Sequence, residues 1–158
     1  MNPLAKEWVE KSEADLATAQ RELAATSSPN PDAVCFHAQQ CVEKLMKAVL
    51  AEKGVQFPKK HDLVFFEQLV KQVAASWTCD RNDLLMLAPG AVDYRYPGQS
   101  AGPQDAKNAV EACDRLRRGY WRCCHLDSDN SYCAPSLREA SVAGNAVSEG
   151  RRPATIFL

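Results

Sequence analysis

The sequence predicts an all-α protein, an antiparallel up-and-down bundle of helices, and three observations lead to this prediction. Five segments repeat apolar residues at steps of three and four, which is the periodicity of an amphipathic helix. No segment shows the alternation of apolar and polar residues that is typical of a half-buried strand. The connections between the segments are short, so consecutive helices are expected to run antiparallel and to pack together.

The stretch 33–54, AVCFHAQQCVEKLMKAVLAEKG, has the clearest helical pattern in the chain. Asn30 is a favourable N-cap, Pro31 fits the first helical position, and Gly54 fits the left-handed residue that ends a helix. One face is an apolar stripe, and the opposite face carries Phe36, Gln39, Gln40, Glu43 and Lys47. An aromatic ring and two amides stand there in place of charged residues, so we expect this helix to be covered on more than one side. The cover is either neighbouring helices or a second copy of the chain.

Two further long helices are predicted, one at each end of the domain. The first extends from an Asn2 N-cap to about Ala25, and the last extends from Pro103 to about His125. Residues 26–31 form the short loop of a helical hairpin between the first helix and the central one.

Two shorter helices are predicted in between. Asp62 stands at the start of one, whose apolar stripe continues to Trp77. Asp80 is a suitable N-cap for the other, and Asp83 occupies the acidic position of a capping box. We expect the pair Pro89–Gly90 to break or kink this second helix.

The helical pattern ends near residue 125, which places a single domain at residues 1–125. Residues 126–158 are rich in Ser, Gly, Asn, Ala and Pro and show no apolar stripe. We expect them to form a disordered C-terminal tail, with a short docking segment such as the terminal TIFL as the alternative.

Composition limits the classes of function. The formal net charge of −1 argues against nucleic-acid binding by overall charge and leaves local basic patches open. The N-terminus is polar and amphipathic, unlike a signal peptide, and no apolar run is long enough to span a membrane, so a cytoplasmic protein is expected. Of the seven cysteines, Cys35, Cys41 and Cys113 fall on helical positions, as small buried hydrophobes of a reducing compartment.

The remaining cysteines invite a test for a metal site. Cys123, Cys124, His125 and Cys133 lie close together in the sequence. Adjacent cysteines rarely face one metal ion, and no pair of cysteines has the spacing of a zinc site. We therefore expect no metal site, and nothing in the sequence indicates a cofactor.

One edge of the central helix is a candidate for ligand binding. His37, Gln40 and Lys44 are three and four residues apart, so their side chains lie over one another. Asp15 lies on the apolar face of the first helix, where an unpaired carboxylate is costly. Its two interpretations are an ion pair with a basic residue of another helix and a functional carboxylate. His61, in a small basic cluster before the third helix, is a weaker candidate.

The segment 91–98, AVDYRYPG, is a second candidate. Tyr94 and Tyr96 flank Arg95, and the Pro-Gly pair after them forces a turn. Arginine can bind a phosphate through two parallel hydrogen bonds, and tyrosine can stack on a base. The alternative is ordinary packing with one surface arginine, and the residue types do not decide between the two.

Positive charge also gathers in the C-terminal half of the last helix, at Arg115, Arg117, Arg118 and Arg122. Positive charge at this end complements the helix dipole, which explains the arginines without a ligand. A face that binds a polyanion is the alternative.

Residues 1 to about 125 resemble the HEPN family, helical domains named for nucleotide binding in higher eukaryotes and prokaryotes. The resemblance rests on the order and spacing of Trp8, Asp15-Leu16, CFHAQQCVEKLMKAVL at 35–50, HDL at 61–63 and YRYPG at 94–98. It implies an up-and-down bundle of four long helices with a short extra helix, often dimeric. It also implies a frequent partner, a minimal nucleotidyltransferase. In some such pairs the HEPN protein is an RNase toxin and the transferase is its antitoxin.

The resemblance further implies that RNase activity depends on an arginine followed four to six residues later by a histidine. Arg95 is followed by YPGQSAG, which contains no histidine. Arg118 and His125 match formally, with six residues between them, but they lie at the end of the last helix and away from the expected region. They are weak candidates for catalysis.

These observations leave three functions open. The first, which we expect, is a non-catalytic module that binds a nucleotide, RNA or the transferase, in a toxin–antitoxin-like pair. Its ligand-binding residues would be His37, Gln40, Lys44, Tyr94, Arg95 and Tyr96, with Asp15 and His61 as weaker additions. The second is a metal-independent RNase, in which arginine stabilises the phosphate and histidine moves a proton. The third is a homodimeric helical protein whose polar pairs are structural. We expect a homodimer because Phe36 lies among polar residues on the outer side of the central helix.

Overall fold

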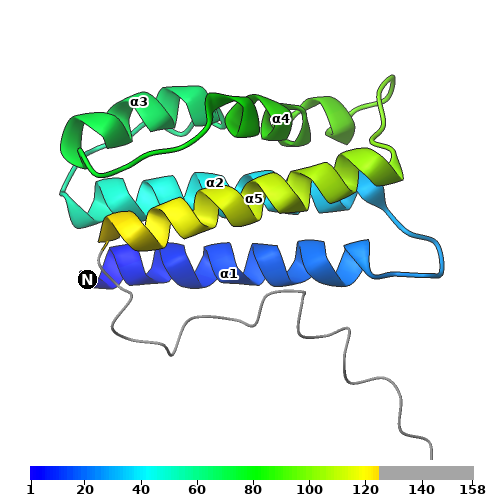
Figure 1. Cartoon of the computed structure of the whole chain (residues 1–158), viewed down its shortest axis with the longest axis horizontal. Helices are drawn as coiled ribbons and strands as arrows, with labels where there is room; N and C mark the ends of the chain where they lie inside the picture. The colour runs from blue at the N-terminus through cyan, green and yellow to red at the C-terminus, as the bar shows by residue number, and fades with distance from the viewer. Residues whose placement is uncertain (125–158) are drawn as a thin grey trace, which may run out of the picture. The chain divides into compact units, whose positions relative to one another are not determined.

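The computed structural model describes residues 1–124 and shows a helical bundle (Figure 1). Its elements are α1 (Pro3–Leu23), α2 (Pro31–Glu52), α3 (Leu63–Val73), α4 (Arg81–Ala91), the 3-10 helix η1 (Asp93–Arg95) and α5 (Pro103–Cys124). The residues from 1 to 124 contain no strand, and the predicted all-α fold is confirmed. His125 and the predicted tail at 126–158 lie outside the described residues.

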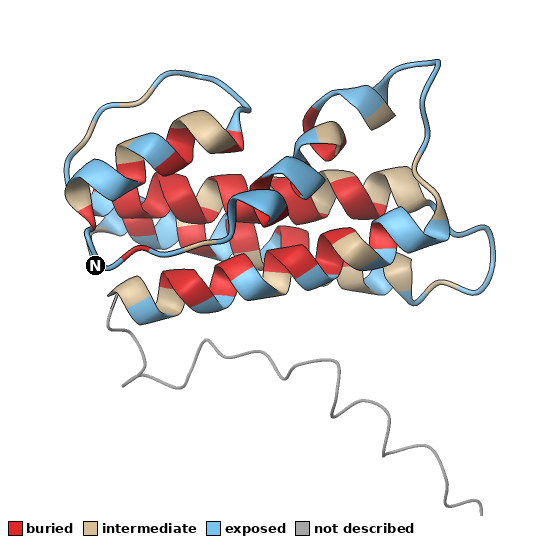
Figure 2. Cartoon of the chain, turned by 45° about the horizontal axis from the view of Figure 1, so that its top comes forward, coloured by how far each residue is buried: buried red, intermediate tan, exposed pale blue. Residues whose placement is uncertain are grey.

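The helix α2 is the centre of the bundle. The long helices α1, α2 and α5 run alongside one another, and the shorter α3 and α4 follow each other along the remaining side (Figure 1). α2 packs against α1, α3, α4, η1 and α5. Buried residues accordingly occupy the inner faces of the helices, where α2 meets its neighbours (Figure 2). Neighbouring helices thus cover α2 on more than one side, as the aromatic ring and the two amides on the face opposite its apolar stripe predict.

The predicted N-caps of α1, α2 and α4 are present, and Gly54 closes α2 as predicted. Side-chain caps hold the first turns of α1, α2, α3 and α4, and they come from Asn2, Asn30, Asp62 and Asp80. At the C-terminus of α2, Gly54 adopts a φ of +68°, and the N–H of Val55 donates to the carbonyl of Leu50 at 2.9 Å. This left-handed glycine and the hydrogen bond from Val55 form a Schellman motif, which ends the helix.

α3 ends at Val73, although the apolar stripe continues to Trp77. Ala74 leaves the helical conformation with φ −138° and ψ 82°, and the N–H of Trp77 closes a turn onto its carbonyl. Trp77 is nevertheless buried in the hydrophobic core, because the loop folds its ring inward. The stripe therefore predicts the burial of Trp77 correctly and its helical conformation wrongly, since a buried side chain does not require a helical backbone.

α4 continues through Pro89 and Gly90 to Ala91, so the break expected at this pair is absent. The glycine serves the packing of α4 on α2. A Cβ atom at position 90 would lie 2.4 Å from the carbonyl oxygen of Cys35 and 3.3 Å from the backbone nitrogen of Phe36. Only glycine lets the two backbones approach this closely.

The described residues also bear on the expectations about membranes and cysteines. Within residues 1–124, none of the helices combines the length and the hydropathy that a membrane crossing requires. Cys35, Cys41 and Cys113 are buried free thiols, as their helical positions predict. No group of three or more His, Cys, Asp or Glu side chains is placed to hold a metal ion in this part of the chain.

Candidate functional site

Asp15 of α1 binds two residues from the predicted edge of α2. Its Oδ1 lies 2.9 Å from Nδ1 of His37, and its Oδ2 accepts a hydrogen bond from Nζ of Lys44. The side chain of Asp15 is 12% exposed, whereas its two partners lie nearer the surface. The ion pair with a basic residue of another helix, one of the two interpretations of Asp15, is therefore present.

Arg95 reaches the same edge through Phe36. Its guanidinium carbon lies 5.2 Å from the centroid of the Phe36 ring, which is the geometry of a cation–π contact. The ring of His37 contacts Phe36 edge-on, with 5.1 Å between the centroids. We call this row of five side chains the α2 edge site: Asp15, Phe36, His37, Lys44 and Arg95.

The two tyrosines beside Arg95 have different surroundings. Tyr96 is 63% exposed, and Tyr94 is partly buried against the core. Burial raises the pKa of the Tyr94 hydroxyl, and the negative charge of Asp105 adds to this effect. Tyr96 therefore presents a free face at the surface, and Tyr94 is mainly a packing residue.

Gln40 and His61 belong to a second network, which surrounds a buried carboxylate. Glu43 is 1% exposed, and its side chain accepts a hydrogen bond from Nζ of Lys47 at 2.6 Å. Nδ1 of His61 lies 3.2 Å from both of its oxygens. Gln39 donates to Glu43 at 3.0 Å, and Gln40 donates to Gln39 at 2.8 Å. Gln40 and His61, which were predicted to bind a ligand, thus lie at the two ends of a structural network around Glu43.

Aromatic rings enclose the cation of this network. Nζ of Lys47 lies 5.3 Å from the ring centroid of Trp8, 6.0 Å from that of Phe57 and 5.1 Å from that of Phe66. Lys47 is only 7% exposed, so its charge depends on Glu43 and on these rings for stabilisation. The unusual polar face of α2 was visible in the sequence, but the sequence did not show that its members pair with one another.

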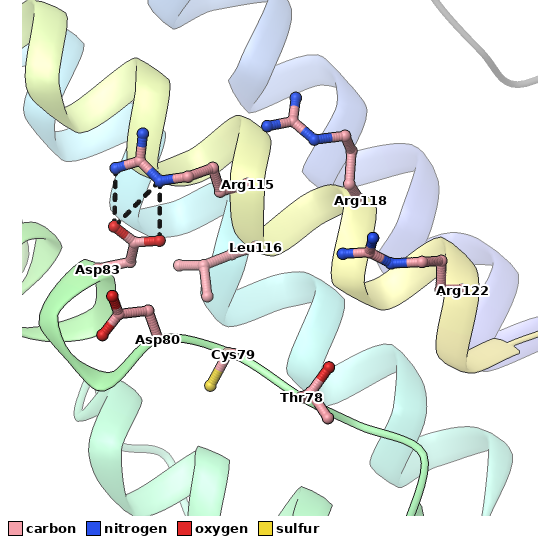
Figure 3. Close-up of a pocket in the computed structure, with 8 residues that line it drawn as sticks. All are labelled: Thr78, Cys79, Asp80, Asp83, Arg115, Leu116, Arg118 and Arg122. Carbon is pink, nitrogen blue, oxygen red and sulfur yellow. Dashed lines mark hydrogen bonds and ion pairs between the residues drawn. The ribbon is translucent and has the colours of Figure 1, made fainter.

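The arginines of α5 have divided roles. Arg117 donates two hydrogen bonds of 2.8 Å to Glu13 of α1. Arg115 binds Asp83 of α4 at 2.7–3.2 Å, as Figure 3 shows. The carboxylate of Asp83 raises the pKa of Arg115. Asp83 lies in the first turn of α4 after the Asp80 N-cap, as predicted, but its carboxylate binds Arg115, and the Asp80 side chain caps the N–H of Asn82. A guanidinium that donates to both carboxylate oxygens is a stronger partner for Asp83 than a single backbone N–H.

Arg118 lies apart from the α2 edge site. It lines a pocket of about 340 Å³ together with Arg122 and the segment that leads into α4 (Figure 3). The residues of this pocket and of the α2 edge site do not overlap. Most of the predicted site residues that the structure describes therefore lie in three places: the α2 edge, the Glu43 network and the pocket beside α5. Tyr94 and Tyr96 flank Arg95 in the chain, next to the α2 edge.

Comparisons with known proteins agree with this architecture. The crystal structure of ST0689, an archaeal HEPN homologue, superposes with a TM-score of 0.54 and 20% sequence identity. The match covers 75% of this chain and 96% of that chain, and at this identity it shows a shared fold. No curated protein matches the sequence. The HEPN domain family model matches residues 5–119, which is more than half of the chain, and this protein therefore belongs to the HEPN domain family.

Proposed function

We propose that this protein is a non-catalytic binding module that takes a nucleotide, or a nucleotidyltransferase partner, at the α2 edge site. Membership of the HEPN family supports a nucleotide- or RNA-related role. The observation that carries the proposal is the position of the Arg95 guanidinium over Phe36, with the exposed ring of Tyr96 next to it in the chain. Such a surface offers a phosphate a cation and offers a base an aromatic face.

The residues directly after Arg95 favour binding over cleavage. RNA cleavage without a metal requires a group that removes the proton of the attacking hydroxyl and a cation that stabilises the charged phosphorane. Arg95 meets the second requirement. Residues 96–102, YPGQSAG, offer no histidine for the first, and a tyrosine hydroxyl ordinarily titrates near pH 10, too high for a base at neutral pH.

Titration calorimetry that measures the affinity for ATP, and for a purified nucleotidyltransferase partner, tests the proposal. Arg95→Ala should lower the affinity for one of them by about 1–3 kcal/mol, the range for a charge-assisted hydrogen bond. The matched control is Arg81→Ala, which removes an exposed arginine of α4 from outside the site. Equal affinities for the wild type and both variants would refute the proposal.

A metal-independent RNase is the second candidate, and one observation favours it. The carboxylate of Asp15 contacts Nδ1 of His37, so Nε2 is the ring nitrogen that this contact does not use. A carboxylate that orients an imidazole in this way is a common support for a general base. The ring of His37 and the guanidinium of Arg95 also contact the same phenylalanine, Phe36.

The RNase candidate has a direct assay, cleavage of single-stranded RNA in the presence of EDTA. If His37 is the base, His37→Ala abolishes cleavage and Asp15→Asn reduces it, while His61→Ala leaves it unchanged because His61 contacts Glu43 instead. Robust cleavage with this pattern would replace the binding proposal. Absence of cleavage by the wild type would remove the RNase candidate.

We also propose a homodimer, as one component of a toxin–antitoxin-like pair. Phe36 is partly covered by Arg95 and His37, so it is a poor anchor for a second copy. Exposed apolar side chains occur instead on α4 and just after it, where Leu85 and Val92 line a shallow apolar pocket. Exposed apolar surface of this kind supports a protein contact.

Analytical ultracentrifugation at tens of micromolar tests the dimer, since a complex with a micromolar dissociation constant persists at this concentration. Leu85→Glu should give a monomer without loss of helicity. Glu111→Gln, an exposed change on α5, is the control. A monomeric wild type would contradict the proposal.

A further inference from the structure

We propose that the pocket between α5 and the segment leading into α4 binds a phosphate group. This α5 arginine pocket is lined by Thr78, Cys79, Asp80, Asp83, Arg115, Leu116, Arg118 and Arg122. The inference goes beyond the proposed function, because the pocket shares no residue with the α2 edge site. At about 340 Å³, the pocket lies at the small end of the range for ligand sites in proteins.

The walls of the pocket come from two elements that approach each other closely. The arginines of α5 form one side, residues 78–80 and Asp83 form the other, and Leu116 lies between them (Figure 3). A Cβ atom at Gly119 would lie 3.0 Å from the carbonyl oxygen of Thr78, so glycine allows this segment to lie against α5. Arg118 and Arg122 are four residues apart, which places them on the same face of the helix.

The charges of the pocket do not cancel. Arg115 is bound by Asp83 through three hydrogen-bond contacts of 2.7–3.2 Å, so these two charges neutralise each other. Asp80 is the N-cap of α4 and accepts a hydrogen bond of 2.8 Å from the backbone of Asn82. Arg118 and Arg122 form no hydrogen bond or ion pair with any residue between 1 and 123. Beyond the Arg115–Asp83 pair, the lining residues therefore carry two guanidinium groups and one carboxylate, that of Asp80.

A further carboxylate near Arg118 belongs to Asp114. Burial raises the pKa of the Asp114 carboxyl, and the neighbouring charges of Arg117 and Arg118 act in the opposite direction, with Arg117 the stronger. Arg118 thus contributes to the field at Asp114 without forming an ion pair with it. Its hydrogen-bond donors stay available to a ligand.

The residue types of the pocket specify the ligand. Guanidinium groups match the oxygens of a phosphate through paired hydrogen bonds, and they are less strongly hydrated than ammonium groups. None of the lining residues is aromatic, so the pocket has no aromatic ring on which a nucleobase could stack. The ligand is therefore a phosphate group recognised without its base, supplied either by the backbone of a single-stranded RNA or by free pyrophosphate.

Two probes distinguish these sources. Fluorescence anisotropy with a labelled oligouridine measures RNA binding over a salt series, and calorimetry with pyrophosphate measures binding of the free anion. The variant Arg118→Ala/Arg122→Ala should lower the affinity for the probe that binds by about tenfold or more, since two charge-assisted contacts are lost. For RNA, the slope of log affinity against log salt should flatten by about 1.4, since each contact with a single strand contributes about 0.7.

Matched variants separate the pocket from general charge effects. Arg21→Ala/Lys107→Ala removes the same net charge from exposed positions outside the pocket and should leave the affinity within about twofold, because distant surface charges are screened. Asp80→Asn keeps a good N-cap and removes the one carboxylate among the lining residues that is not paired with an arginine, so it should strengthen binding. Unfolding curves confirm that each variant is folded.

The outcome is decisive in either direction. Weaker binding in the Arg118→Ala/Arg122→Ala variant together with stronger binding in Asp80→Asn supports the pocket, and the probe that responds identifies the source of the phosphate. Wild-type protein that binds neither probe, or binding that the double variant leaves unchanged, overturns the inference. Arg95→Ala in the same assays reports on the α2 edge site alone, so a failure there is distinguishable from a failure of the pocket.

Discussion

At the α2 edge site two of the basic residues, His37 and Lys44, share one carboxylate, whereas in the α5 arginine pocket Arg118 and Arg122 share none. Asp15 holds both His37 and Lys44. Arg118 and Arg122 have no such carboxylate among residues 1–124, although two other arginines of the same helix do. A cation that is already paired must lose that partner before it binds a ligand, and this loss offsets the gain. The location of an anion site is therefore indicated by the pairing of basic residues and not by their number.

The largest effect is expected where the paired charges are most deeply buried. Glu43→Ala leaves Lys47, which is 7% exposed, without its carboxylate, and it should lower the free energy of unfolding by about 3–5 kcal/mol. Urea denaturation measures this loss. Glu7→Ala removes the exposed partner of Lys11 in a comparable helical pair and should change stability by less than about 0.5 kcal/mol. Equal effects would show that burial does not distinguish the two pairs.

A smaller loss is expected at the α2 edge site. Asp15→Ala removes the shared partner of His37 and Lys44, but both side chains can turn toward water. We expect a loss of about 1–3 kcal/mol, the cost of losing hydrogen bonds to a charged group. A double-mutant cycle with Lys44→Ala isolates the ion pair. A coupling energy near zero would mean that Asp15 contributes through packing alone.

Asp114 sharpens the comparison, because it is a carboxylate whose nearby cations do not fully offset its burial. Its pKa in the folded protein lies above the ordinary value of about 3.9, so the folded state holds the proton more tightly than the unfolded state. Its contribution to stability therefore falls as the pH rises through the window above 3.9. Asp114→Asn should raise stability at pH 7 by less than about 1 kcal/mol, with no gain below pH 3.9. Chemical denaturation at pH 7 and at a pH below 3.9 tests this prediction. A variant less stable than the wild type at pH 7 would show that the Asp114 carboxylate stabilises the fold.

The smallest effect on stability is expected for the unpaired arginines. Arg118→Ala/Arg122→Ala removes two exposed side chains that form no ion pair within the described part of the chain. The free energy of unfolding, measured by thermal denaturation, should therefore change by less than about 0.5 kcal/mol. Arg117→Ala, which leaves Glu13 without its guanidinium, is the contrasting variant and should destabilise clearly. A large loss of stability in the double variant would show that Arg118 and Arg122 stabilise the fold, as Arg117 does.

The fold could be predicted from the sequence because its signals are local. Caps such as Asn2 and Asn30 act within one helical turn, and the apolar stripes repeat along a single helix. Residues close together in the sequence are enough to specify these features, and the structure contains them. The exceptions, Trp77 and Gly90, are residues whose positions depend on another segment: the core in one case, and the backbone of Cys35 in the other.

The candidate sites were less predictable, because a charged residue has a local explanation whether or not it has a distant partner. Arg115 suits the helix dipole and Asp83 suits a capping box, yet they bind each other across 32 residues of sequence. Arg117 and Glu13 are 104 residues apart. Local rules assign all four arginines of α5 the same role, and only the packing of α1 and α4 against α5 separates the paired from the unpaired.

The close approach of the α4 and α2 backbones at Gly90 also determines the distance between the Arg95 guanidinium and the Phe36 ring. The backbone of α4 touches that of α2 one residue before Phe36, and the chain then needs only η1 to carry Arg95 over the ring. Any side chain at position 90 must push the end of α4 outward, and the guanidinium would move with it. A methyl group that lies far from any ligand would thus loosen the α2 edge site. Position 90 is therefore a place where a change with no chemistry of its own can tune what the surface binds.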